Sequence, residues 1–99
     1  MLTEKDYCDL DTSHELWVMG LEPEAYYDGP LILLYEAQKW MREVKKLHIT
    51  IYSQSQESWQ YRITKPHQRL EDGLHGEDFS SFEEALLHAI KECIEYVKQ

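Results

Sequence analysis

The clearest pattern along the chain is a helical period that changes to an alternating one near residue 47. At about 100° per residue, the apolar residues of the stretch 31–47 share one arc of a helix. They are Leu33, Leu34, Ala37, Trp40, Met41, Val44 and Leu47. Asp28-Gly29-Pro30 precedes this stretch and indicates the helix start, because Pro at the first helical position loses no hydrogen bond. We therefore expect an amphipathic helix over residues 31–46.

Two strands are predicted directly after this helix. In residues 47–53, Leu47, Ile49 and Ile51 alternate with polar neighbours, and in residues 59–64 the same holds for Trp59, Tyr61 and Ile63. The polar stretch 54–58 separates the two runs. The pattern predicts a hairpin with one apolar face, and that face needs a helix layer to cover it.

The region before the main helix carries a second helix signal. Residues 1–11 have alternating charge and no clear period, so we expect a loosely ordered start. Thr12 and Glu15 have the spacing of a capping box, which predicts a short helix from Ser13 to Met19 that ends at Gly20. The same residues are also compatible with a short strand.

Beyond the hairpin, the chain passes through a polar segment into a last helix. Residues 68–78 form either a plain loop or a loop with a short edge strand, near Arg69–Glu71 or Leu74–Phe79. Ser81 and Glu84 form a second capping box, and the final helix is expected over residues 82–97.

These elements together predict a single α+β domain over residues 1–99. We expect two long helices on one face of a small antiparallel sheet, in the order α-β-β-(β)-α, with a short N-terminal helix. The predicted core consists of Ala37, Met41, Val44, Ile49, Ile51, Tyr61, Ile63, Phe82, Leu86, Ala89 and Cys93.

Composition excludes some classes of function. The formal net charge of -9 opposes binding to nucleic acid or to an anionic membrane surface, because such binders need a basic footprint. No stretch approaches the roughly 20 apolar residues of a membrane span, and the N-terminus lacks the apolar run of a signal peptide. We expect a cytoplasmic protein in which Cys8 and Cys93 are free thiols rather than a disulfide.

No catalytic, cofactor or metal signature rises above its ordinary structural reading. The histidines lack the close pairs that zinc sites show; they are His14, His48, His67, His75 and His88. The acidic run Glu71, Asp72, Glu77 and Asp78 lacks the regular spacing of a calcium loop. The polar side of the hairpin reads as a binding platform or as a plain solvent-facing sheet; it holds His48, Thr50, Tyr52, Gln60, Arg62 and Thr64. We predict no enzyme, no cofactor and no metal site.

Residues 31–97 contain several short sequence motifs that resemble those of a known group of proteins. These motifs are the segment Ala37 to Val44, the pair His48-Ile49, the predicted strand Trp59 to Ile63 and the segment Phe79 to Ala85, with Met19 to Pro23 as a further motif upstream. They resemble small uncharacterised proteins of Bacteroides-type phages and conjugative elements. The resemblance implies an origin in a mobile element and a shared fold, and it carries no established activity.

The order helix, antiparallel strands, helix is also similar to the double-stranded-RNA-binding fold. That family places lysines at the start of its last helix to reach phosphates. Here those positions are Ser81, Phe82, Glu83 and Glu84. The resemblance therefore extends to architecture, and the acidic residues argue against the activity.

The leading prediction for function is a small accessory protein that binds another protein or itself. Apolar residues of the final helix spread over roughly 200°, more than one packed surface requires. Leu87, Ile90 and Ile94 lie toward the far edge of this arc. Either a homodimer covers them, with Leu87 and Ile94 near its centre, or the N-terminal segment with Trp17 and Leu21 does so within the chain. The alternative function is a nucleic-acid-associated protein that uses the hairpin face.

Overall fold

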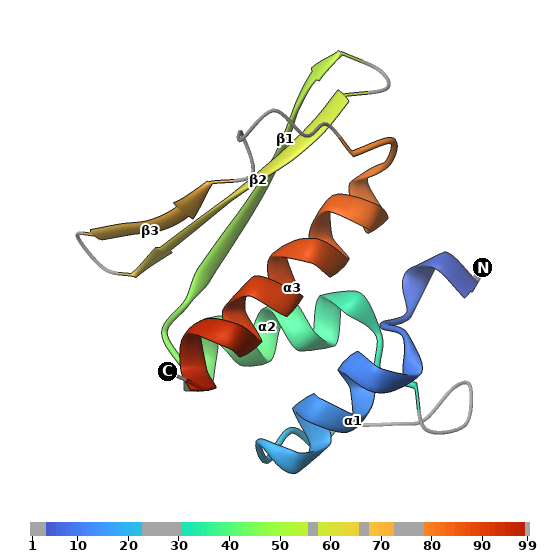
Figure 1. Cartoon of the computed structure of the whole chain (residues 1–99), viewed down its shortest axis with the longest axis vertical. Coiled ribbons are helices and arrows are strands. Elements are labelled where there is room, and N and C mark those ends of the chain that lie inside the picture. The colour runs from blue at the N-terminus through green and yellow to red at the C-terminus, as the bar shows by residue number, and fades with distance from the viewer. Residues whose placement is uncertain (1–3, 23–30, 56–57, 66–67, 73–78, 99) are drawn as a thin grey trace.

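The computed structural model of the protein describes residues 4–22, 31–55, 58–65, 68–72 and 79–98. Within them the chain forms a 3-10 helix η1 (Glu4–Asp6), helices α1 (Leu10–Val18), α2 (Leu34–Val44) and α3 (Phe82–Lys98), and strands β1 (His48–Ser55), β2 (Ser58–Lys65) and β3 (Gln68–Asp72). The predicted α+β fold is confirmed: α2 and α3 lie against one face of an antiparallel sheet, with α1 beside them (Figure 1).

The sheet has the strand order β1-β2-β3. β1 and β2 form the predicted hairpin, in which Ile51 lies opposite Tyr61 and Ser53 opposite Trp59. β3 pairs with the second half of β2, so the first of the two predicted edge-strand positions is the observed one. At the first half of β2, the backbones of Trp59 and Phe79 exchange hydrogen bonds of 2.9 Å in both directions.

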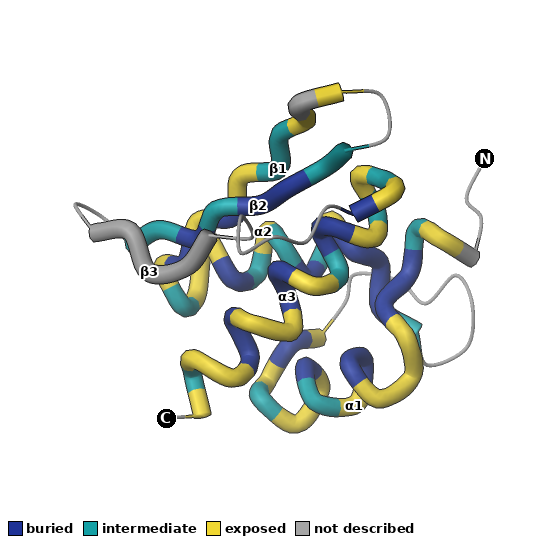
Figure 2. The backbone as a smooth tube through the Cα atoms, turned by 45° about the horizontal axis from the view of Figure 1, so that its top comes forward, coloured by how far each residue is buried: buried dark blue, intermediate teal, exposed yellow. Residues whose placement is uncertain are grey.

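The core fills the space between the sheet and the helices, where Figure 2 shows the buried stretches of α2, α3 and β2 facing one another. Most of the predicted core residues are buried there: Ala37, Met41, Ile49, Tyr61, Ile63, Leu86, Ala89 and Cys93. The pattern of each segment was sufficient to find them, because each apolar face has only the other elements to pack against.

Three predicted core residues are not fully buried. Val44 and Phe82 are exposed, by 54% and 41%, and Ile51 is only partly buried. Val44 is the last residue of α2 and Phe82 the first of α3, so both stand at helix ends, where fewer neighbours are within reach. The ring of Phe82 meets that of Trp59 edge-on, with centroids 5.8 Å apart. The helical period alone does not distinguish a helix end from its middle.

The prediction of a loose start is wrong for residues 4–11. Tyr7 forms a bridge with Leu33, and the N–H of Cys8 donates to the carbonyl of Ile32 at 2.8 Å. Both Tyr7 and Cys8 are buried. The segment is held by residues far along the chain, which its own local sequence does not reveal.

The ends of α2 also differ from the prediction. The helix begins at Leu34 with Leu33 as its cap and no side-chain cap bond; the predicted turn at residues 28–30 lies outside the described part of the chain. At the other end, Lys46 adopts a left-handed backbone conformation with φ of 61°. The N–H of Leu47 then reaches back to the carbonyl of Met41 at 2.9 Å, which closes the helix.

The cap at Ser81 is confirmed, but the reciprocal bond of a capping box, from the Ser81 N–H to the Glu84 carboxylate, is replaced by bonds from Ser80. Ser81 Oγ accepts a hydrogen bond from the N–H of Glu84 at 3.1 Å, as expected for a cap. The Glu84 carboxylate turns to Ser80, accepting from its hydroxyl at 2.6 Å and from its N–H at 3.3 Å. The hydrogen bond from the Ser80 side chain is the main reason that the pKa of Glu84 lies below its ordinary value. None of the helices in the described residues is both long and apolar enough to span a bilayer.

Candidate protein-binding face of helix α1

Helix α1 is fixed at both ends. Asp9 Oδ1 accepts a hydrogen bond from the N–H of Thr12 at 2.8 Å, so Asp9 is the cap and the predicted cap Thr12 lies inside the helix. At the other end, Gly20 has φ of 111°, and the N–H of Leu21 donates to the carbonyl of Leu16 at 3.0 Å. The predicted stop at Gly20 is confirmed, since this φ is one that favours glycine.

The side of α1 that faces the rest of the protein is poor in apolar residues. Its buried side chains are Thr12, Ser13 and Leu16. Ser13 Oγ accepts a hydrogen bond from the N–H of Ile32 at 3.0 Å and lies 3.5 Å from the carbonyl of Cys8. This side is therefore held partly by hydrogen bonds that tie α1 to the segment before α2.

The opposite side of α1 is apolar and open to solvent. Leu10, Trp17 and Val18 are exposed by 58%, 58% and 64%, and the His14 ring lies 6.2 Å from that of Trp17. These four residues, which we call the α1 outer face, have the helical spacing i, i+4, i+7 and i+8. At about 100° per residue they span an arc of roughly 100°, the width of a helix stripe that packs on a partner.

The two sides of α1 are thus reversed with respect to an ordinary surface helix. A surface helix usually buries its apolar stripe and exposes polar residues. In α1 two of the three buried side chains carry hydroxyl groups, while a Trp, a Leu and a Val point outward. Single exposed apolar residues are common, but a contiguous stripe on one helix is typical of an interaction surface.

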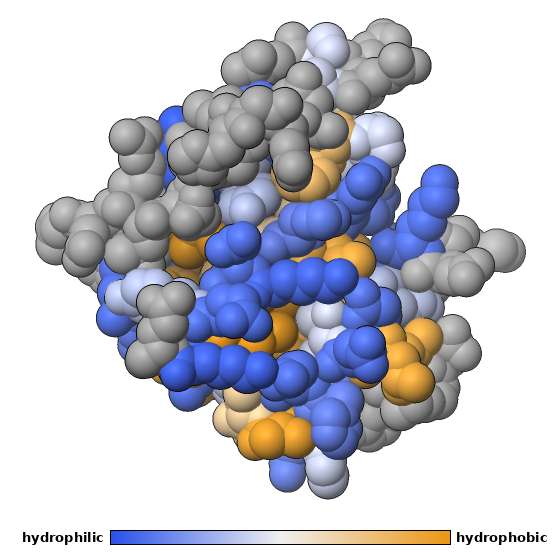
Figure 3. All heavy atoms as spheres, in the orientation of Figure 1, coloured by the Kyte–Doolittle hydropathy of each residue, from blue (hydrophilic) through white to orange (hydrophobic). Residues whose placement is uncertain are grey.

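Figure 3 shows this contrast on the molecular surface. Hydrophobic side chains reach the surface at the lower rim, over the position of α1 in Figure 1, beside a band of hydrophilic side chains along α3. Lys91 and Lys98 of α3 form ion pairs with Asp9 at 3.0 Å and with Glu15 at 2.9 Å. The two ion pairs hold α1 on α3, and they do not involve the residues of the α1 outer face.

The charges next to the outer face are mainly negative. Asp11 and Glu22 are exposed on or just after α1. Asp9 is partly desolvated, which raises its pKa, but hydrogen bonds from Thr12 and Lys91 outweigh this and hold the pKa below its ordinary value. Asp9 is therefore ionised at neutral pH and its charge is paired with Lys91, so Asp11 and Glu22 are the exposed carboxylates that give this end of the protein its negative charge.

Two of the three residues predicted for a dimer interface are buried within the chain. Ile90 and Ile94 are buried, and Leu87 is partly buried against the core. Leu87 lines a groove of about 530 Å³ together with Tyr7, Cys8 and Leu34. Ile94 lies between the Lys91 and Lys98 ion pairs to α1, beside Thr12 and Glu15. Ile90 and Ile94 are thus covered within the chain, whereas Trp17, which the intramolecular alternative placed over the far edge of the last helix, is exposed.

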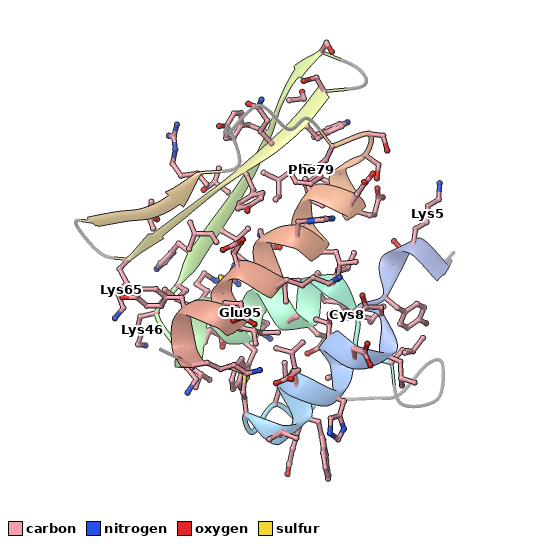
Figure 4. All side chains as sticks on the ribbon, viewed as in Figure 1. Lys5, Cys8, Lys46, Lys65, Phe79 and Glu95 are labelled. Carbon is pink, nitrogen blue, oxygen red and sulfur yellow. The ribbon has the colours of Figure 1, made fainter. Side chains whose placement is uncertain are left out.

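Both cysteines are free, as expected, and both are buried. Burial raises the pKa of Cys8 and of Cys93 to about 12. Figure 4 places Cys8 where the N-terminal segment turns in toward α2 and α3, while Lys5 points away from the body. Buried thiols with raised pKa are not nucleophiles at neutral pH, so these residues act as small hydrophobic side chains.

The polar face of the hairpin holds few open groups. His48 and Thr50 are exposed, while Gln60 on the same face is only 5% exposed. The guanidinium of Arg62 lies 5.6 Å from the ring centroid of Tyr52. This face is therefore partly closed by its own side chains. Among the described residues, His, Cys, Asp and Glu side chains form no cluster of three or more that could hold a metal.

A lysine-lined depression lies at the opposite end of the helices. It has a volume of about 370 Å³ and is lined by Lys45, Leu47, Lys65, Tyr96 and Val97. In Figure 4, Lys65 and the neighbouring Lys46 lie at this end. Because both α2 and α3 end here, their carbonyl groups produce a negative potential that the lysines offset. Lys65 Nζ also lies over the Tyr96 ring, 5.6 Å from its centroid. These contacts account for the lysines without an anionic ligand.

The α1 outer face was missed in the sequence because the helix was expected to begin at Ser13. With that start, Leu10 falls outside the helix and Trp17 and Val18 appear as isolated apolar residues. The available signal was Asp9, a second cap residue whose choice brings Leu10, His14, Trp17 and Val18 onto one side.

No family model matches the chain, and neither the curated proteins nor the solved structures contain a match.

Proposed function

We propose that the protein functions as a protein-protein interaction module, and that it binds its partner through the α1 outer face. One observation carries the proposal: the solvent side of α1 presents Leu10, Trp17 and Val18, while its packed side is mostly hydroxyl-bearing. Tryptophan is enriched among residues that dominate binding energy, because it buries a large area at a small cost in conformational entropy.

The partner is a protein with an apolar patch surrounded by Lys or Arg. The formal net charge of -9 and the exposed Asp11 and Glu22 beside the face favour a cationic surface. If a second copy bound face to face at α1, the carboxylates of the two copies would lie close together and repel one another. Charge therefore supports a different, basic partner at this face over self-association.

The wider setting belongs to the same proposal. The resemblance of residues 31–97 to small proteins of phages and conjugative elements supports an accessory role in such an element, in the cytoplasm. We propose no catalytic activity. The acidic first turn of α3, with Glu83 and Glu84, supports a protein partner over the alternative of a nucleic acid.

The experiment is a fluorescence titration with synthetic amphipathic helical peptides of equal apolar content and of positive, neutral or negative net charge. Trp17 is the exposed tryptophan, since Trp40 and Trp59 are partly buried. We expect the cationic peptide to bind and shift the emission to shorter wavelength, with weaker binding as peptide charge falls or salt rises.

The matched variants are Trp17→Ala and Tyr35→Ala. Tyr35 is a comparably exposed aromatic residue on α2, so its removal controls for loss of exposed aromatic area. Peptide binding, measured by anisotropy of a labelled peptide, is expected to be lost in Trp17→Ala and kept in Tyr35→Ala. Equal binding by both variants, or tighter binding to a DNA or RNA duplex than to any peptide, would contradict the proposal.

A further inference from the structure

Strand β1 forms a free edge of the sheet. Its only ladder partner among the described residues is β2, on the other side. Its sequence, HITIYSQS, contains no Asp, Glu, Lys, Arg or Pro. Proteins usually protect an exposed edge with charged residues, proline or a covering segment, because an open edge is a template for another strand. The sequence of β1 therefore supplies neither a charged residue nor a proline to protect this edge.

The hydrogen-bond pattern shows which groups of β1 point outward. Trp59 directs both its N–H and its C=O to Phe79, away from β1. Paired residues of an antiparallel ladder either face each other or face away together, and successive residues alternate. Ser53, which lies opposite Trp59, therefore directs its backbone groups to the free edge. The same alternation turns the backbone groups of Ile51 and Ile49 outward.

Among the described residues, a side chain of α2 covers one end of this edge, and no backbone partner lies at the other end. Gln38 of α2 donates from Nε2 to the carbonyl of Ile49 at 3.1 Å, which satisfies the first outward carbonyl. The register shifts between Ser53 and Ser55, so the regular edge ends there. Between these limits lie the outward groups of Ile51 and Ser53. Figure 1 shows the turn end of the β1–β2 hairpin reaching beyond α2 and α3.

We infer that a second copy of the chain binds here by antiparallel pairing of β1 with β1. A two-fold axis at Tyr52 places Ile51 of one protomer opposite Ser53 of the other, and both residues then exchange N–H and C=O hydrogen bonds. The two Tyr52 side chains lie opposite each other across the axis, where an aromatic cross-strand pair is favourable.

The outward groups at Ile51 and Ser53 are symmetric about Tyr52 and so favour a second copy as the occupant, and the charge of the strand permits it. The chain carries 19 acidic residues, but none lies in β1. The edge is therefore a place where two copies of this acidic protein can meet without opposing carboxylates in the paired strands. The open stretch is short, so the dimer is weak and forms as concentration rises. It would present two α1 outer faces at once, but it does not depend on what they bind.

The test is amide hydrogen exchange by NMR on the whole chain, from ~10 µM to ~1 mM, with the mass followed by sedimentation. The amides of Ile51 and Ser53 are expected to slow by ~tenfold or more as the dimer forms. The amides of Thr50 and Tyr52 point to β2 and serve as an internal control, protected at every concentration. No substitution is needed for this measurement.

A variant then locates the contact. Ser53→Pro removes an outward N–H that has no role in the β1-β2 ladder, and it is expected to abolish the dimer. Trp17→Ala is expected to leave it unchanged. A chain that stays monomeric with fast exchange at Ile51 and Ser53 would overturn the inference. So would a dimer that survives Ser53→Pro in a folded protein or is lost in Trp17→Ala.

Discussion

The hydroxyl of Ser13 accepts a hydrogen bond from the buried N–H of Ile32 at 3.0 Å and so joins α1 to the segment that leads into α2. Ser13 is 1% exposed and Ile32 equally so. Because water cannot replace the lost acceptor, Ser13→Ala is expected to lower the free energy of unfolding by about 1–3 kcal/mol. Urea denaturation measures this, with Ser53→Ala as the exposed control; equal stability of both variants would contradict the role of this bond.

The left-handed conformation of Lys46 gives a second prediction. A side chain at φ of 61° is unfavourable, and glycine relieves the strain. Lys46→Gly is therefore expected to raise the free energy of unfolding by about 0.5–1 kcal/mol, although it removes the bond from Lys46 Nζ to the Glu43 carbonyl. The matched variant Lys45→Gly, at φ of -95°, is expected to destabilise the protein. The reverse order in thermal melts would contradict this backbone geometry.

Acid sensitivity follows from Asp9. Its pKa is lower in the folded chain than the ordinary value of 3.8, so its contribution to stability is fully present above the pKa of the unfolded chain. The contribution is lost as pH falls through the lower pKa of the folded state. Asp9→Asn is expected to flatten the fall in stability across this acidic window, measured by urea denaturation at several pH values. An unchanged slope would show that Asp9 is not bonded as observed.

The difference in burial between Ile63 and Ile51 predicts which of two substitutions in the sheet lowers the free energy of unfolding more. Ile63 is 2% exposed, whereas Ile51 is only partly buried. Ile63→Ala is expected to cost about 2–5 kcal/mol, and Ile51→Ala less than that. The sequence places both residues equally inside, so denaturation of the two variants separates the observed packing from the expected one.

Local patterns were sufficient to predict much of the fold. The hairpin, the cap at Ser81 and the stop at Gly20 each depend on residues a few positions apart, and the structure has all three. The start of α1 was predicted wrongly because Asp9 and Thr12 are both good caps, and tertiary contacts decide between them. The Thr12 side chain is buried on the packed side of α1, while Asp9 also forms an ion pair with Lys91 of α3.

The α1 outer face follows from the sequence only if Asp9 is chosen as the cap, and distant contacts decide that choice. Leu87 and Ile94 are on the wide apolar arc of α3, but a helical period does not tell which element covers that arc. In the fold, Leu87 lines a groove together with Tyr7 and Cys8, and Ile94 is buried next to the ion pairs that join α1 to α3. The same packing that covers these residues turns Trp17 and Val18 to solvent. The exposed face is thus a consequence of long-range packing.

The most direct test of the α1 outer face is NMR mapping of a cationic amphipathic peptide on the isotope-labelled protein. We predict that chemical-shift changes centre on Leu10, His14, Trp17 and Val18, and that the indole N–H of Trp17 shifts in proportion to the bound fraction. The signals of β2 are expected to stay in place. Shifts centred on the hairpin or on the lysine-lined depression, or no shifts at α1 at saturating peptide, would contradict the account.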